Sequence, residues 1–205
     1  MWALIEDGSI TKLINNPKAM VIGDTRYSRN IFSFRWTNAE REAIGLYEIV
    51  WDNSKKKDEE YYVNTNQTFT YDADAGTVTA TYGDATARAH ADSLYTAQDE
   101  SDGKGTEGEV KAEGLKTKKI RTIKQQAASE LARTDWYIVR KADANTAVPS
   151  AITNHRAAVR TKCAAMETSV TNASNTAAIE TLYTYTTDED GVTSRPLGNL
   201  PTLEV

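Results

Sequence analysis

The first part of the chain carries short runs of apolar residues separated by turn-forming residues. Apolar side chains are frequent in 1–6 and again in 9–14, and Asp7-Gly8 stands between the two runs. An Asp-Gly pair in this setting is typical of a type I′ hairpin, because both central residues of that turn need positive φ. Further apolar runs lie at 20–22, 31–36 and 46–51. This pattern predicts a series of strands.

One short helix is predicted between two of these strands. Thr37 and Asn38 are residue types that cap helix N-termini, and Glu40 lies close to the capping-box position. Gly45 would end the helix, because glycine readily adopts the left-handed conformation found there.

Strict alternation appears further on. Val78, Ala80 and Tyr82 fall on one face of a strand, and the threonines between them fall on the other. This period of two is typical of an antiparallel sheet with one buried and one wet face. Apolar runs at 61–63 and 69–71 and a turn at 72–76 precede it. We therefore predict an antiparallel β-rich domain over residues 1–97.

The composition changes at residue 98. Between 98 and 114 nearly every residue is small or charged, and four glycines are scattered through the segment. Such a composition is typical of a flexible linker.

From residue 115 the apolar positions follow a helical period. Ile120, Ile123, Ala127 and Leu131 form one stripe, and a second stripe follows Pro149-Ser150. The second stripe consists of Ile152, Val159, Cys163, Met166 and Val170. Two amphipathic helices with a short connection usually pair antiparallel. A shorter helix at 176–183 would close the same core.

The predicted fold class is therefore α+β. A helical hairpin module at 115–187 follows the β-rich domain and the linker. The tail from 188 to 205 contains two prolines and two glycines and is expected to be extended.

Composition supports a folded domain and excludes several classes of protein. The 205 residues include 17 aromatic side chains, too many for a disordered chain, and the net charge is −5. No apolar run approaches the ~20 residues that span a bilayer. The start has no basic n-region and reaches Glu6 and Asp7 at once, which does not suit a signal peptide. We expect no membrane partner.

The sequence offers little for catalysis or metal binding. Cys163 is the only cysteine and lies on an apolar stripe, which indicates a buried thiol. His90 and His155 are the only histidines, so a Cys/His zinc site is not expected. The acidic turn at 72–76 departs from the calcium-loop pattern and favours a plain turn. We expect no enzyme activity, no cofactor and no metal.

One segment is strongly basic. Residues 116–141 contain eight basic and two acidic side chains, a local net charge of +6. Nucleic acid could bind such a stripe electrostatically, but no aromatic residue interleaves with the lysines. We favour a solvated helix face that meets an acidic protein surface, such as Asp99-Glu100 or 188–190 of this chain.

Two sequence motifs lie in the helical module. The first helix ends in Leu131-x-x-Thr134-Asp135-Trp136, and the second helix contains His155-Arg156-x-x-Val159-Arg160. Residues 129–163 resemble the tail-assembly-chaperone-type module of bacteriophages. In the usual family form, tyrosine stands at the place of His155 and leucine at that of Val159, while both arginines are shared. Through residues 1–6, 10–23 and 27–29, the N-terminal half more loosely resembles tail or virion structural proteins of marine phages.

The resemblance implies a protein that acts by protein–protein contact without a cofactor. Physical reasoning adds that Trp136 would plug the end of the hairpin, and that Asp135 would cap the turn or pair with Arg156 or Arg160.

Of three functions weighed, we predict the first and keep the other two as alternatives. The first is a structural component of the virion tail, made in the host cytoplasm, whose partners are other tail proteins and copies of itself. The second is an assembly chaperone that is absent from the virion, and the third is a nucleic-acid-binding accessory protein.

Overall fold

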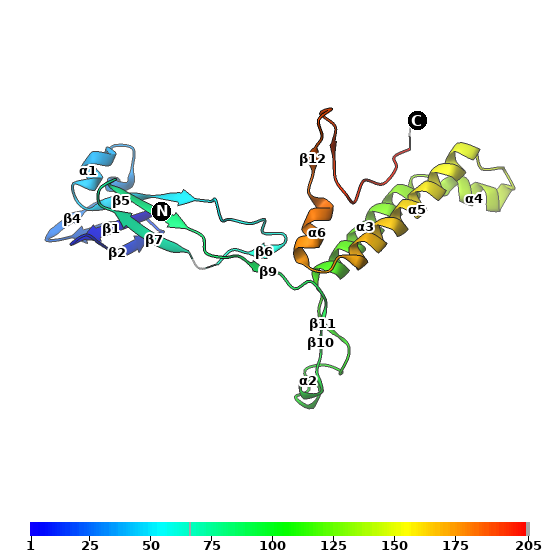
Figure 1. The fold of residues 1–205 in the computed structure, drawn as a ribbon, viewed down its shortest axis with the longest axis horizontal. Helices are drawn as coiled ribbons and strands as arrows, with labels where there is room; N and C mark the ends of the chain where they lie inside the picture. The colour runs from blue at the N-terminus through cyan, green and yellow to red at the C-terminus, as the bar shows by residue number, and fades with distance from the viewer. Residues whose placement is uncertain (66, 204–205) are drawn as a thin grey trace. The chain divides into compact units, whose positions relative to one another are not determined.

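The computed structural model describes residues 1–65 and 67–203 and divides the chain into two compact units, Met1–Thr86 and Ala87–Val205. Strands dominate the first unit and helices the second (Figure 1), which confirms the predicted α+β class. None of the helices in these described ranges is long and apolar enough to cross a membrane.

A curved five-stranded sheet forms the first unit. In spatial order its strands are β2 (Ser9–Ile14), β1 (Trp2–Glu6), β5 (Leu46–Asp52), β8 (Thr77–Thr81) and β7 (Thr68–Asp72). The two edge strands β2 and β7 contact each other, so the sheet curls strongly.

The prediction of a purely antiparallel sheet is wrong at one pair of strands. β5 and β8 run parallel, with Ile49 opposite Val78, whereas the other pairs in this sheet are antiparallel. The tight turn at 72–76 makes β7 and β8 antiparallel, and β8 rather than β7 then lies beside β5. Local sequence determines the hairpin, but it does not determine which of its strands inserts next to β5.

Local turn and cap signals are confirmed. Asp7 and Gly8 have φ values of 51° and 73°, as the hairpin between β1 and β2 requires. The short helix α1 (Asn38–Glu42) has a complete capping box between Thr37 and Glu40. The further short strands of this unit are β3 (Met20–Ile22), β4 (Thr25–Tyr27) and β6 (Tyr62–Val63).

The apolar run at 31–36 does not form the strand that its composition predicts. Residues Arg29–Phe32 form a 3-10 helix, η1, which is capped by the Ser28 side chain. Ile31 is buried in a cluster with Trp2 and Leu46, so the run supplies core residues from a turn of helix. An apolar run of this length fits either conformation, and packing decided between them.

The first unit ends earlier than the predicted boundary at residue 97. The division falls within β9 (Thr86–Ala87), because the following residues are hydrogen-bonded to the helical unit. The Thr176 hydroxyl donates to the Arg88 carbonyl at 2.9 Å, and the Leu115 amide donates to the Ala89 carbonyl at 2.9 Å.

The predicted linker at 98–114 contains regular structure. β10 (Ser93–Leu94) and β11 (Val110–Ala112) form an antiparallel pair, and α2 (Ala97–Ser101) lies between them in the sequence. We call residues 93–112 the arm. Thr96 and Asp99 form a capping box that starts α2, and the Lys111 ammonium pairs with Asp99 at 3.0 Å. The prediction of a flexible linker is wrong here, because composition reveals neither the pairing of β10 with β11 nor the contacts of Asp99.

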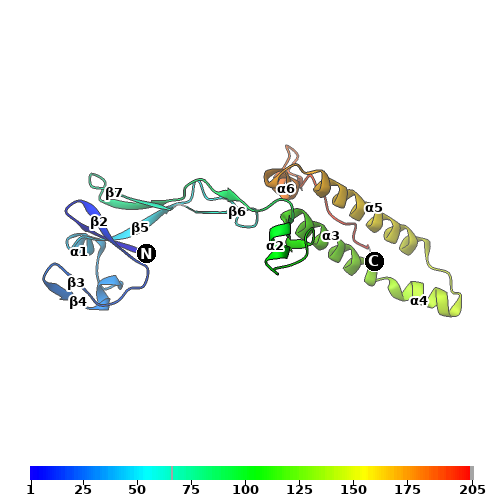
Figure 2. The ribbon, with the colours of Figure 1, turned by 90° about the horizontal axis from the view of Figure 1, so that it is seen from below.

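The helical hairpin is confirmed. α3 (Leu115–Ala132) pairs with α5 (Ser150–Asn172), and α6 (Thr176–Tyr183) closes the core (Figure 2). The pairing is antiparallel: Lys124 meets Glu167, while Arg156 meets the Leu131 carbonyl further along. The core consists of Ile123, Ala127, Val159, Cys163, Met166, Val170 and Leu197.

The tail also joins this core. β12 (Thr186–Thr187) and β13 (Thr193–Ser194) form a small hairpin, which replaces part of the predicted extended segment. Leu197 is then buried in the hairpin core and Leu200 packs against it. The final two residues of the predicted tail lie outside the described residues.

Candidate docking site at the end of the helical hairpin

The chain breaks its helix at Thr134. α3 ends with Arg133 as its C-cap, and a new helix, α4 (Asp135–Ala144), begins directly afterwards. Thr134 itself is only 1% exposed, with φ −119° and ψ 4°, and its hydroxyl donates to the Leu131 carbonyl at 2.9 Å. The Thr134 amide donates to the same carbonyl at 3.0 Å, so both groups of Thr134 close the end of α3.

Arg156 fastens α5 to this break. Its Nη1 lies 2.7 Å from the Leu131 carbonyl, 2.7 Å from the Thr134 hydroxyl and 2.8 Å from a carboxylate oxygen of Asp135. The predicted pairing of Asp135 with Arg156 or Arg160 is therefore confirmed for Arg156. The fold brings together Thr134, Asp135 and Arg156, three of the six candidate residues.

His155 is buried next to this anchor but faces another group. Its Nε2 lies 3.4 Å from a carboxylate oxygen of Glu130. Burial opposes ionisation of Glu130, but hydrogen bonds from Arg133 and from the Leu203 amide hold the pKa of its carboxyl below the usual value. His155 thus belongs to the packing between α3, α5 and the tail.

The prediction that Trp136 plugs the hairpin is wrong. The Trp136 side chain is 52% exposed. Its ring lies 3.9 Å from the Tyr137 ring, and the Arg140 guanidinium stacks over it at 4.6 Å. The break at Thr134 leads the chain into a separate helix whose residues are all at least partly exposed, so the indole does not enter the core.

Arg160, the last candidate residue, stands apart from the anchor. Its side chain is exposed, and it forms no hydrogen bond or ion pair with residues 1–65 or 67–203. It is therefore available to solvent or to a partner.

α4 presents an exposed apolar surface. Trp136, Ile138 and Val139 are all exposed, Val139 at 65%, and no residue of α4 is buried. We use the name α4 face for these three residues; Trp136 and Val139, three positions apart, are neighbours on the helix, while Ile138 points to another side of it. The sequence analysis predicts only a short connection between the two paired helices and misses this helix. The run Trp136–Val139 directly after Thr-Asp was the available signal, because Thr and Asp are typical of helix starts.

Three basic side chains in and directly after α3 form ion pairs with acidic residues. Arg121 pairs with Glu113, Lys124 with Glu167 at 3.2 Å, and Arg133 with Glu130 at 3.1 Å. The partners are acidic residues of the same unit, although not the two acidic clusters that the sequence suggested. This pairing supports the interpretation of a solvated helix face.

The remaining chemical candidates have structural explanations. Burial and a hydrogen bond to Glu167 raise the pKa of the Cys163 thiol, which favours the inert form. The Asp72 carboxylate accepts hydrogen bonds from the Asp74 and Ala75 amides, as in an ordinary turn. Within the described ranges, no three His, Cys, Asp or Glu side chains gather as a metal site.

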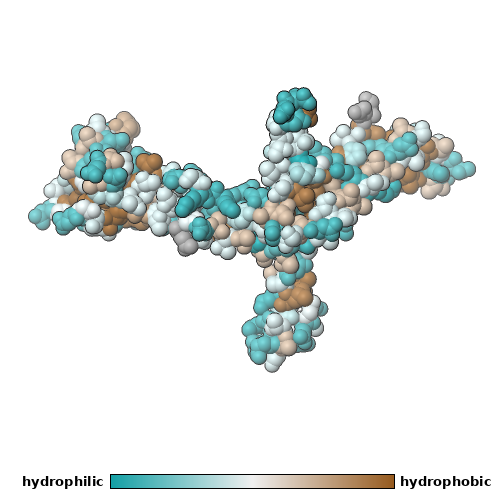
Figure 3. Space-filling model, in the orientation of Figure 1, coloured by the Kyte–Doolittle hydropathy of each residue, from teal (hydrophilic) through white to brown (hydrophobic). Residues whose placement is uncertain are grey.

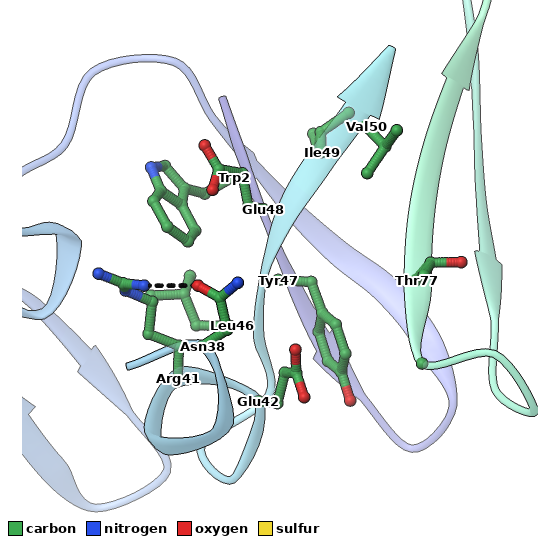
Figure 4. Close-up of a pocket in the computed structure, with 11 residues that line it drawn as sticks. Trp2, Asn38, Arg41, Glu42, Leu46, Tyr47, Glu48, Ile49, Val50 and Thr77 are labelled. Carbon is green, nitrogen blue, oxygen red and sulfur yellow. Dashed lines mark hydrogen bonds between the residues drawn. The ribbon is translucent and has the colours of Figure 1, made fainter. Parts of the chain in front are cut away.

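The first unit contains a concavity of about 270 Å³ between α1 and the sheet (Figure 4). Arg41 is the buried charged residue of its wall, and its N–H groups bond to Asn38, to the Ile31 carbonyl and to the Ser33 carbonyl. The guanidinium also lies 4.9 Å from the centroid of the Trp2 ring. Arg41 therefore connects α1 to η1 and to the sheet, which is a structural role.

Comparison with known proteins finds no match for this chain among family models, curated proteins or solved structures.

Proposed function

We propose that this chain is a structural component of a bacteriophage tail, as a tail fibre, baseplate or tail-tip adaptor protein, and that it acts by protein–protein docking. The observation that carries this proposal is the α4 face. Three large apolar side chains lie exposed on one short helix, next to Tyr137 and Arg140. Exposed apolar patches mark interaction sites, and Trp, Tyr and Arg are the residues that contribute most to protein interfaces.

The motif shared with the phage module supports the same proposal. Thr134 and Arg156 belong to the residues that carry the resemblance, and they form the break from which α4 starts. The shared residues thus present the helix that would dock. Docking requires neither a catalytic group nor a cofactor, and the proposal includes none.

Mass spectrometry of purified phage particles tests this function. We expect the chain in particles of the phage that encodes it, at a copy number comparable to other tail proteins. A Val139→Glu variant should fold but should be depleted from particles. Val192→Glu is the matched control, because Val192 is similarly exposed at 57% and lies in the tail hairpin. Absence of the wild-type chain from particles would contradict the proposal.

An assembly chaperone is the alternative that the resemblance at 129–163 favours. It predicts that tails fail to assemble without the chain although finished particles lack it. The same mass spectrometry, combined with electron microscopy of particles made without the gene, separates the two functions.

A nucleic-acid-binding role is disfavoured by the ion pairs on α3. It predicts DNA binding that weakens steeply with salt and is lost when Lys118, Lys119 and Arg121 become glutamate. Fluorescence anisotropy with duplex DNA measures this directly. We expect no binding at 150 mM salt, on the order of physiological ionic strength.

A further inference from the structure

Residues 196–203 lie over the core of the helical unit, and we call them the strap. Leu197 is only 2% exposed and belongs to the core that α3 and α5 form, and Leu200 packs against the same core. Figure 2 shows this part of the chain beside α3 and α5. The strap therefore completes an apolar core that the helices alone would leave open to water. We call the part of the core that Leu197 and Leu200 occupy the strap site.

Few polar bonds hold the strap in its site. The Leu197 amide donates to the Leu182 carbonyl at 3.0 Å, and the Leu203 amide donates to a carboxylate oxygen of Glu130 at 3.4 Å. Within residues 1–65 and 67–203, the other hydrogen bonds of the strap join it to Arg195, the residue directly before it. Burial of leucine side chains is therefore the main attachment, and the strap of another copy would fit the site equally well.

A weak hairpin connects the strap to α6. Residues 184–195, which we call the hinge, contain β12 and β13, two strands of two residues each, and all four of these residues are exposed. An isolated two-stranded hairpin is only marginally stable in water. Polar residues gather over this hairpin in Figure 3. Opening the hinge therefore exposes little additional apolar surface.

The hinge is long enough to carry the strap to another molecule. In the closed form its two ends meet, because Leu182 before it and Leu197 after it are hydrogen-bonded. When extended, its 12 residues would span about 40 Å. This reach exceeds the length of α3, which is about 27 Å for 18 residues. A second copy offers an identical strap site, so the opened hinge can place the strap there.

We propose that two copies of this chain exchange their straps, so that Leu197 of each copy completes the core of the other. The contacts of the strap in the exchanged dimer are those seen within one copy, and only the hinge changes its conformation. Because the exchange is reciprocal, it closes a two-fold dimer. This inference goes beyond the proposed function and does not involve the α4 face.

Substitutions in the hinge test the exchange, because those in the strap would weaken the closed and exchanged forms equally. Gly191 has φ of 79°, and a Cβ atom there meets nothing within 4 Å. Alanine strains this closed turn but not an extended hinge, so Gly191→Ala should raise the dimerisation constant about tenfold per copy. Gly76→Ala is the matched control, with φ of 61° and equally open surroundings in the first unit. Sedimentation velocity over a range of concentrations should show a wild-type dimer that Gly76→Ala leaves unchanged.

A reversible lock on the hinge provides the sharper test. Thr187 and Thr193 face each other across the hairpin, with hydroxyl oxygens 2.9 Å apart. A Thr187→Cys/Thr193→Cys chain should form a disulfide that holds the hinge closed, so it should be monomeric when oxidised and associate like the wild type when reduced. Thr68→Cys/Thr81→Cys is the matched control, because these hydroxyl oxygens lie 2.7 Å apart across β7 and β8. This control should associate in both states, and circular dichroism checks that each variant keeps its helices.

The proposal fails if the wild-type and Gly191→Ala chains both remain monomeric at every concentration. It also fails if the oxidised Thr187→Cys/Thr193→Cys chain associates as strongly as the reduced one, because the contact would then lie on another surface. A chain that is monomeric in solution but present in particles would remove the exchange and leave the proposed tail function standing. A chain that exchanges straps but is absent from particles would remove only the tail function.

Discussion

One nitrogen atom of Arg156 contacts three residues, Leu131, Thr134 and Asp135. It is buried, and its contacts reach the end of α3, the break at Thr134 and the start of α4. Asp135 is itself well exposed, so water screens that ion pair and its contribution is small. The bonds to the Leu131 carbonyl and the Thr134 hydroxyl carry most of the effect, because Arg156 makes them in the interior, where water does not compete for its guanidinium.

Replacement of Arg156 should therefore destabilise the helical unit. We expect Arg156→Ala to lower the free energy of unfolding by about 3 kcal/mol. Urea unfolding followed by circular dichroism measures it. Arg160→Ala is the matched control on the same helix and should change stability by less than about 0.5 kcal/mol. Equal effects of the two replacements would contradict the anchoring role.

The Trp136 side chain is half exposed although its place in the helical pattern predicted burial. A buried indole replaced by alanine would cost about 3–5 kcal/mol. Because the ring is half exposed, we expect Trp136→Ala to cost about 1 kcal/mol or less, mainly from contact with Tyr137 and Arg140. Thermal unfolding tests this, and a loss near the larger value would mean that the ring is buried after all.

At the scale of elements, short polar signals determined where helices and turns begin and end. The Thr37–Glu40 capping box starts α1, and Gly45 ends that segment with φ of 78°. At Gly45 the backbone also passes close to the Ile5 carbonyl, so a Cβ atom there would overlap the carbonyl oxygen. The connection between α1 and β5 therefore depends on glycine for two separate reasons.

Gly45→Ala and Gly76→Ala are a matched pair of variants that separates the effect of positive φ from the effect of the close Ile5 carbonyl. Both glycines have positive φ, which costs alanine about 1–2 kcal/mol, but a Cβ atom at Gly76 meets nothing within 4 Å. We expect Gly45→Ala to be clearly more destabilising, because the backbone must also move away from Ile5. Tryptophan fluorescence during urea unfolding reports on the first unit, which contains three of the four tryptophans. Equal losses would show that the carbonyl contact is unimportant.

At the scale of the whole molecule, the two units have separate cores. Ala3, Ile49 and Val78 belong to the core of the sheet, whereas Ile123 and Val159 belong to that of the helices. Each unit therefore buries apolar surface without the other, as an independently folding domain does.

Fragments 1–86 and 87–205 should accordingly fold when produced separately. We expect fragment 87–205 to keep its helical circular dichroism and to unfold cooperatively. It retains residues 88–92, which are hydrogen-bonded to α6 and to the start of α3. A fragment that starts at residue 115 should be less stable, since it loses those bonds. Non-cooperative unfolding of fragment 87–205 would contradict the division of the chain.

The sequence by itself determined the α+β class, the Asp7-Gly8 hairpin, the α1 cap and the paired helices with their apolar stripes. These features depend on residues close together in the chain, where turn chemistry and periodicity act directly. It also gave two possible roles for Asp135, a cap of the turn or a pair with Arg156 or Arg160, and the structure shows the pair with Arg156.

Only the tertiary structure decided the parallel pairing of β5 with β8, the order within the arm and the exposure of Trp136. Each depends on which distant segment supplies a partner: β8 inserts beside β5, Lys111 reaches Asp99, and Arg156 fixes the break that leads α4 out of the core. A choice between competing long-range contacts leaves no local sequence pattern, so only the tertiary structure revealed the exposed α4 face.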